Sequence, residues 1–155
     1  MLNNYVLRSV RYMLDLSDAQ MVTIVKLADL TVTKEEMNLW LKKDTDPDYV
    51  ECNDVVLGHF LNGLIYHRRG KDENRAAPDV EARINNNIIF KKLRVAFELK
   101  DVDLLDIYQS VDFRVSKPEL SAIFRNPEHK NYRECGDQLL RYLLKGLTLR
   151  LRKNK

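Results

Sequence analysis

The sequence consists of two copies of one pattern, and this duplication constrains the fold more than any other feature of the chain. Distinctive short segments return after the same interval of 83 positions, so the two copies align without a gap. The matched pairs are Asn3-Asn4 with Asn86-Asn87, Tyr49–Asp54 with Tyr132–Asp137, and Gly63-Leu64 with Gly146-Leu147. A self-match at constant offset indicates that each copy folds into the same supersecondary unit.

The spacing of apolar residues predicts helices throughout each copy. Val6, Val10 and Met13, for example, recur at the interval of one helical face. No segment has a convincing strand pattern. We expect an all-α protein of two tandem four-helix repeats packed as one pseudosymmetric unit, related by a twofold or a screw operation. In the first copy the helices are predicted at about 4–15, 18–28 and 53–68, with the third of the four helices starting at Thr33. In the second copy they are predicted at about 101–111 and 136–152, with the third helix starting at Ser116.

The starts of several helices are marked by capping residues. A hydroxyl residue followed three positions later by glutamate forms a capping box, in which each side chain satisfies a free backbone amide. An asparagine can also cap a helix by accepting from the amides of the first turn. The predicted boxes are Thr33-x-x-Glu36 and Ser116-x-x-Glu119, and the predicted asparagine caps are Asn4 and Asn87.

The helix breakers divide the chain into three parts. We expect a first repeat at residues 1–66, a linker at residues 67–85 and a second repeat at residues 86–155. Gly70 should end the fourth helix and Pro78 should discourage its continuation, so the connector between them is predicted to be exposed.

The two repeats differ in charge although they share a pattern. Residues 1–66 carry 6 basic and 10 acidic side chains, a balance of −4, whereas residues 86–155 carry 15 and 9, a balance of +6. Such divergence favours different partners for the two faces, or attraction between the halves.

Composition narrows the class of protein. An apolar fraction of 45% is sufficient for a core, and no stretch resembles a signal peptide or the roughly 20 apolar residues of a membrane span. We therefore expect a cytoplasmic protein without a membrane segment. Cys52 and Cys135 occupy matched positions and are expected to be reduced thiols rather than a disulfide framework.

Four segments of the sequence are distinctive: Phe60–Ile65, Arg69–Glu73, Ile84–Ile88 and His129–Gln138. Together they closely resemble the YehS-like family of small bacterial proteins, which is classed as a domain of unknown function. The resemblance covers essentially the whole chain and implies a bacterial cytoplasmic protein with a built-in repeat. It implies no catalytic residue, cofactor or substrate.

The cysteines have two interpretations. A thiol at a helix start can become a reactive thiolate, but the neighbouring acidic residues would raise its pKa. We favour a small buried side chain in each repeat, with the carboxylates complementing the helix dipole. A metal site would need Cys52, Cys135 and some of His59, His67 and His129, whose spacing is not that of zinc ligands, so no metal or cofactor is expected.

A nucleic-acid interface is the sharper alternative. The second and third helices of each repeat resemble a helix-turn-helix, although Glu35 and Glu36 stand at the end that would approach DNA. The second repeat is also rich in cations, which would suit phosphates or an acidic protein surface equally well. The candidate anion contacts are Lys91, Lys92, Arg94, Lys130 and Arg133.

Gly63 and Gly146 interrupt otherwise good helices in both copies. We expect close backbone contact there, at the contact between the two repeats.

Phosphate-binding glycine loops, nucleophile elbows and metal motifs are missing from the sequence. The favoured function is a non-enzymatic binding or adaptor protein with an acidic first half and a basic second half. A nucleic-acid-binding regulator is the first alternative, and an enzyme with a site between the repeats is the second. The sequence specifies neither the protein partner nor the oligomeric state.

Overall fold

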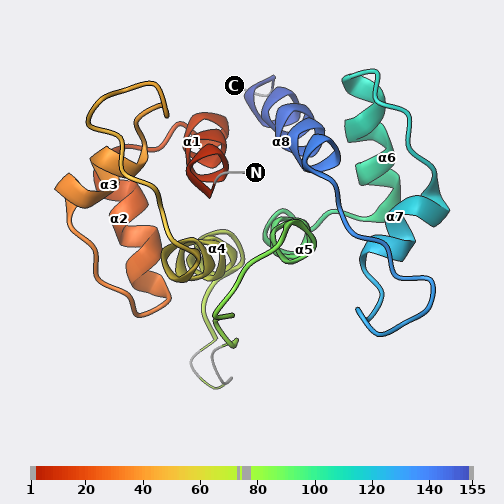
Figure 1. Ribbon diagram of the computed structural model, residues 1–155, viewed down its shortest axis with the longest axis horizontal. Coiled ribbons are helices and arrows are strands. Elements are labelled where there is room, and N and C mark those ends of the chain that lie inside the picture. The colour runs from red at the N-terminus through yellow and green to blue at the C-terminus, as the bar shows by residue number, and fades with distance from the viewer. Residues whose placement is uncertain (1–2, 73, 75–77, 154–155) are drawn as a thin grey trace.

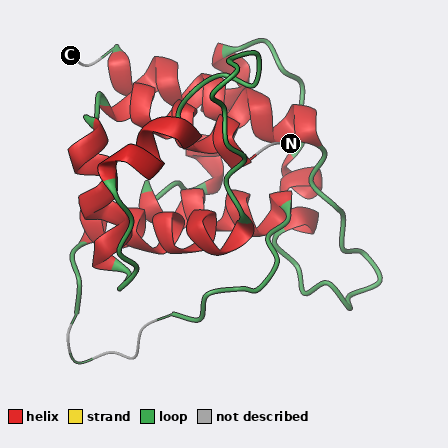
Figure 2. Ribbon diagram, turned by 60° about the vertical axis from the view of Figure 1, so that its left-hand side comes forward, coloured by secondary structure: helices red, strands yellow, loops and turns green. Residues whose placement is uncertain are grey.

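The computed structural model describes residues 3–72, 74 and 78–153. The described residues form eight helices and no strand (Figure 2). The all-α prediction is confirmed, and the chain is built from two tandem repeats of four helices. Parts of the predicted linker (residues 73 and 75–77) and both predicted repeat ends (1–2 and 154–155) lie outside the described residues. The helices are α1 (Asn3–Leu14), α2 (Asp18–Leu27), α3 (Lys34–Trp40), α4 (Asp54–Arg69), α5 (Asn86–Ala96), α6 (Asp101–Ser110), α7 (Lys117–Ile123) and α8 (Asp137–Arg152).

The turns between helices are duplicated together with the helices. Asp15 after α1 and Glu98 after α5 have φ values of 56° and 52°, and Asp29 and Asp112 after the second helix of each repeat have 67° and 54°. This left-handed conformation is uncommon for residues other than glycine. Its return at matched positions shows that the two copies keep the same backbone path.

The predicted capping boxes are present. The Thr33 hydroxyl accepts from the backbone amide of Glu36 at 3.0 Å, and the Glu36 carboxylate accepts from the amide of Thr33 at 2.9 Å. Ser116 and Glu119 form the same pair at the start of α7. Gly70 ends α4 at a φ of 86°, as its position in the sequence predicts.

A buried asparagine ties α1 to two distant segments of its own repeat. The amide nitrogen of Asn4 donates to the carbonyls of Trp40 and Val50 at 2.9 and 2.8 Å, and its oxygen accepts from the amide of Cys52 at 2.9 Å. One side chain therefore satisfies three backbone groups beside α3 and before α4, which would otherwise be without partners.

Asn87 does the same in the second repeat. It donates to the carbonyls of Ile123 and Arg133 at 3.1 and 2.9 Å and accepts from the amide of Cys135 at 2.8 Å. These bonds explain why the asparagine recurs in the sequence, whereas the cysteine contributes only its backbone amide, which any residue except proline could supply.

The prediction that Asn4 and Asn87 cap their helices is therefore wrong. Asn85 is the N-cap of α5, and its side chain accepts from the amide of Ile88 at 2.9 Å. Both asparagines lie inside a helix instead, because burial favours a side chain that can satisfy several backbone groups at once.

The repeats pack around a pseudo-twofold axis rather than a screw axis. Helices α1, α4, α5 and α8 form the centre, with α2 and α3 on one side and α6 and α7 on the other (Figure 1). Helix α1 packs on α8, and α4 packs on α5. Exchanging the two copies turns one of these pairs into the other, because α5 corresponds to α1 and α8 to α4.

Both repeats contribute to one hydrophobic core. Leu7, Phe60, Phe90 and Leu143 are fully buried and belong to the same cluster. Each such side chain contributes about 1.5–3 kcal/mol through its removal from water. The two halves consequently share their main source of stability.

The two recurrent glycines permit close helix contact, but within each repeat. A Cβ added at Gly63 in α4 would overlap the carbonyl oxygen of Ile24 in α2. One added at Gly146 in α8 would lie 2.7 Å from the carbonyl oxygen of Ile107 in α6. The expectation that they lie at the contact between repeats is wrong, since a glycine in a helix indicates a close approach without identifying the neighbour.

Candidate ligand-binding groove

A groove runs along the contact between α1 and α8, where the two repeats meet. Its volume is about 430 Å³. We refer to it as the α1–α8 groove. Its walls are Tyr5, Arg8, Ser9 and Tyr12 from α1, and Arg141, Tyr142, Leu144, Lys145, Thr148 and Leu149 from α8.

Helical periodicity places these side chains together. The four residues from α1 are spaced at i, i+3, i+4 and i+7, which is one face of a helix. The buried face of α1 lies beside it and includes Val6 and Val10. On α8, Arg141, Lys145 and Thr148 follow the same spacing. Each helix thus packs one stripe into the core and presents a neighbouring stripe to the groove.

The groove is positively charged. Arg8, Arg141 and Lys145 are among its ten lining residues, and none of the ten is acidic. Arg141 and Lys145 are exposed, whereas Arg8 is half-buried and donates to the carbonyl of Lys42 at 3.0 Å. The concave shape concentrates the field of these cations and favours negatively charged ligands.

Aromatic rings accompany the cations. The guanidinium groups of Arg8 and Arg141 each lie 5.9 Å from the centre of the Tyr5 ring, and the Lys145 ammonium lies 5.7 Å from that of Tyr142. Tyr12 is 60% exposed. A ligand in the groove would therefore meet apolar ring surfaces as well as charge.

A second hollow of about 870 Å³ extends the groove toward α6. The two share Tyr12, Thr148 and Leu149. Here the guanidinium of Arg152 lies 4.2 Å from the centre of the Tyr12 ring and donates to the Tyr12 carbonyl at 2.7 Å. Asp106 is the only acidic side chain in this wall, so the positive character continues along α8.

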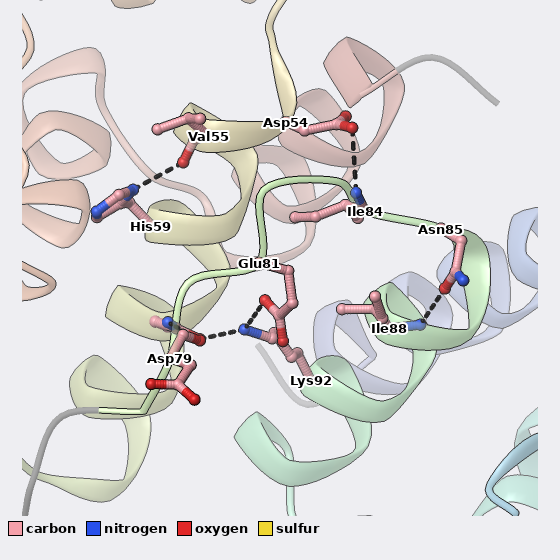
Figure 3. A network of polar contacts seen from close by, with 10 residues as sticks. Asp54, Val55, His59, Asp79, Glu81, Ile84, Asn85, Ile88 and Lys92 are labelled. Atoms are coloured by element: carbon pink, nitrogen blue, oxygen red, sulfur yellow. Dashed lines mark hydrogen bonds and ion pairs between the residues drawn. The ribbon is translucent and has the colours of Figure 1, made fainter. Parts of the chain in front are cut away.

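The cations predicted from the sequence do not form one surface. Lys92 is buried, and its ammonium contacts the Glu81 carboxylate at 2.8 Å and the Asn62 side-chain oxygen at 2.6 Å. Its charge is therefore paired with a carboxylate of the protein itself. Figure 3 shows Lys92 and Glu81 facing each other beside α5.

The remaining predicted contacts are more accessible but separated. Arg94 bonds to Asp101 at 3.0 Å and shares a surface hollow with the exposed Lys91. Arg133 lies 3.7 Å from Glu119 beside α7, and Lys130 is exposed in the loop before α8. None of the five lines the α1–α8 groove.

Sequence reasoning did not identify this groove, although one signal was present. Tyr5, Arg8 and Tyr12 stand on one helical face of the first repeat, and Arg141 and Lys145 stand one turn apart in the second. Nothing local indicates that the first helix of one repeat packs against the last helix of the other.

The cysteines are buried, free thiols. Burial, followed by the carboxylate of Asp54, raises the pKa of Cys52 to about 12. Burial and the carboxylate of Asp137 raise the pKa of Cys135 to about 12. Such thiols are protonated at neutral pH. The expectation that both cysteines are small buried side chains is confirmed by their position in the core. Within the described part of the chain, no three His, Cys, Asp or Glu side chains are grouped to hold a metal ion.

The helix-turn-helix-like elements lie on the outer sides of the molecule. Helix α3 has 7 residues, and Glu35 and Glu36 in its first turn are exposed. Their carboxylates would repel a phosphate backbone approaching this end. None of the described helices has the length and apolar character needed to cross a membrane.

Comparison with known proteins finds the same family in both repeats. The family model described as "Protein of unknown function (DUF1456)" matches twice, at residues 3–70 and 86–153. A relative from Escherichia coli (strain K12), described as the uncharacterized protein YehS, is 52% identical over 150 residues. The match covers 97% of this chain and 96% of the relative. No solved structure matches the chain.

Proposed function

The chain belongs to the DUF1456 family, and we propose that it is a non-enzymatic cytoplasmic binding module that holds an extended, negatively charged ligand in the α1–α8 groove. One observation carries the proposal: three cations and three tyrosines converge on a groove whose ten lining residues include no carboxylate. The free thiols suit the reducing environment of a cytoplasm.

The groove suits binding better than catalysis. It lies between the repeats, where an enzyme site was the second alternative from the sequence. Its lining residues include no Asp, Glu, His or Cys, so no carboxylate or imidazole of the lining could activate a hydroxyl there. The hydroxyls of Ser9 and Thr148 donate to the backbone carbonyls of Tyr5 and Leu144. Cations and rings can attract and orient a ligand without a chemical step.

Single-stranded nucleic acid is a second candidate for the same groove. Tyr5, Tyr12 and Tyr142 offer ring faces on which bases could stack, and the neighbouring cations could contact phosphates. This candidate differs from the helix-turn-helix interface suggested by the sequence, because it uses α1 and α8 instead of α3 and α7.

The test is a titration of ¹⁵N-labelled protein with a short poly-glutamate peptide and, separately, a short oligothymidine, each over a salt series. We expect at least one probe to shift amide signals of α1 and α8, and salt to reverse the shifts because the ligand is held by charge. The variant Arg141→Glu/Lys145→Glu should lose these shifts.

The matched control is Lys91→Glu/Lys130→Glu, which makes the same change in net charge at two exposed positions outside the groove. It should leave the shifts unchanged. Loss of binding in this control alone would transfer the site to the cations predicted from the sequence. Absence of shifts with both probes would refute a groove for anionic ligands.

A further inference from the structure

The pseudo-twofold axis gives the molecule a second groove equivalent to the first. The contact between α4 and α5 corresponds to that between α8 and α1. Gly58, Asn62 and Lys92 there stand where Arg141, Lys145 and Ser9 stand in the α1–α8 groove. We refer to this second site as the α4–α5 groove.

The α4–α5 groove is occupied by a segment of the chain itself, residues 78–84, which bends at Ala82 and Arg83. Val80 and Ile84 lie over Gly58, with side-chain atoms 3.1 and 3.2 Å from the position that a Cβ would take there. The Asn62 side chain is 3.5 Å from the carbonyl of Asp79. Figure 3 shows this segment passing between the two helices.

Charge and backbone contacts fix the segment in place. The Glu81 carboxylate pairs with the buried ammonium of Lys92 at 2.8 Å. The backbone amide of Ile84 donates to the Asp54 carboxylate at 3.1 Å. The segment thus supplies apolar side chains, one acidic side chain that pairs with a cation, and a backbone amide that bonds to a carboxylate.

The α1–α8 groove keeps this architecture but is more basic. Gly58 is replaced by Arg141 and Asn62 by Lys145, so one wall gains two cations. The other wall exchanges Lys92 for Ser9 and keeps a cation at Arg8, which corresponds to Lys91. Ile88 and Val95 are replaced by Tyr5 and Tyr12, which widens the ring surface of the other wall. An occupant of the same kind would therefore need more acidic side chains, together with apolar side chains that can contact the rings.

We propose that the α1–α8 groove binds a short acidic peptide segment of a partner protein, placed between the two helices as residues 78–84 are placed in the equivalent groove. This inference rests on the proposed function and names the class of its ligand. Polypeptide is favoured over nucleic acid because a polypeptide occupies the symmetry-related site. Acidic and apolar side chains both fit, because the native segment places Glu81 against a cation and Val80 and Ile84 on an apolar surface.

The probe is a fluorescein-labelled peptide, Pro-Asp-Val-Glu-Ala-Glu-Ile, which is the segment 78–84 with the change Arg83→Glu. Fluorescence anisotropy would compare it with a peptide in which every acidic residue is replaced by lysine, and with a short oligothymidine. We expect micromolar binding of the acidic peptide, and none of its lysine counterpart. Arg141→Glu/Lys145→Glu should weaken binding roughly 10-fold or more, whereas Lys91→Glu/Lys130→Glu should not.

The possible outcomes distinguish the peptide inference from the proposed function of the α1–α8 groove. Tighter binding of oligothymidine in the groove would overturn the peptide inference and leave the proposed function intact. Shifts of amide signals in α1 and α8 with poly-glutamate, but no binding of the acidic peptide, would likewise overturn the peptide inference and leave the proposed function intact. Peptide-induced shifts confined to α4 and α5 would show displacement of the native segment and would also overturn the inference. Matching thermal melts of both double variants would exclude misfolding as the cause of lost binding.

Discussion

Two buried asparagines, one in each repeat, join three segments that are far apart in the sequence. Asn4 and Asn87 each make three hydrogen bonds to backbone groups, and the amide that donates to each belongs to a cysteine. A backbone group left without a partner in the interior costs about 1–3 kcal/mol. These side chains are therefore structural, and their recurrence needs no functional explanation.

Replacing Asn87 by Ala should destabilise the protein by about 2–4 kcal/mol, because two carbonyls and one amide lose their partner. Replacing Asn85, the actual cap of α5, should cost about 1 kcal/mol. Urea denaturation followed by circular dichroism measures both. A larger loss for Asn85→Ala than for Asn87→Ala would contradict the assignment.

Among the helices, close contact is controlled by glycines. Gly63 lets α4 rest on the backbone of α2, and Gly146 lets α8 approach α6. Gly58 faces the side chains of Val80 and Ile84 instead of a backbone. A helix backbone yields less readily than a side chain, so the three sites should tolerate a methyl group differently.

Substitution by Ala should lower the melting temperature most at Gly63, less at Gly146 and least at Gly58. At Gly63 the overlap with the Ile24 carbonyl should exceed the gain in helix propensity of about 1 kcal/mol and leave a net loss of roughly 1–3 kcal/mol. Differential scanning calorimetry of the three variants gives the order. Equal melting temperatures would mean that α2 and α4 can separate freely, contrary to the packing seen here.

In the molecule as a whole, the two repeats pack together as two subunits of a dimer would, although they belong to one chain. The first helix of each repeat packs against the last helix of the other, so α1 packs on α8 and α5 on α4. The continuous core extends across both contacts. Neither repeat buries its inner helices without the other, which favours cooperative unfolding of the two halves.

Leu143→Ala, a core truncation in the second repeat, tests this coupling. Leu143 is fully buried, and the cavity should cost about 2–5 kcal/mol. The single tryptophan, Trp40, reports on the first repeat. We expect its fluorescence transition in urea to move to lower concentration together with the transition measured by circular dichroism. A fluorescence midpoint that stays at the wild-type value would show that the repeats unfold independently.

The sequence by itself determined the repeat, the helical class and most helix boundaries. These features are local: apolar spacing defines a helix, and the Thr33 and Ser116 boxes define where one starts. The constant interval of 83 positions showed that both copies share one path. The adjacent carboxylates also argued against a reactive thiolate, and the structure places both cysteines in the interior.

Only the tertiary structure decided which helices of the two repeats meet. An apolar face shows that a helix packs against another element, but it does not show which one, since many helices have a similar face. For that reason the α1–α8 groove, the occupied α4–α5 groove and the internal pairing of Lys92 with Glu81 could not be predicted. Each depends on contacts between residues that the pseudo-twofold packing, and no local pattern, brings together.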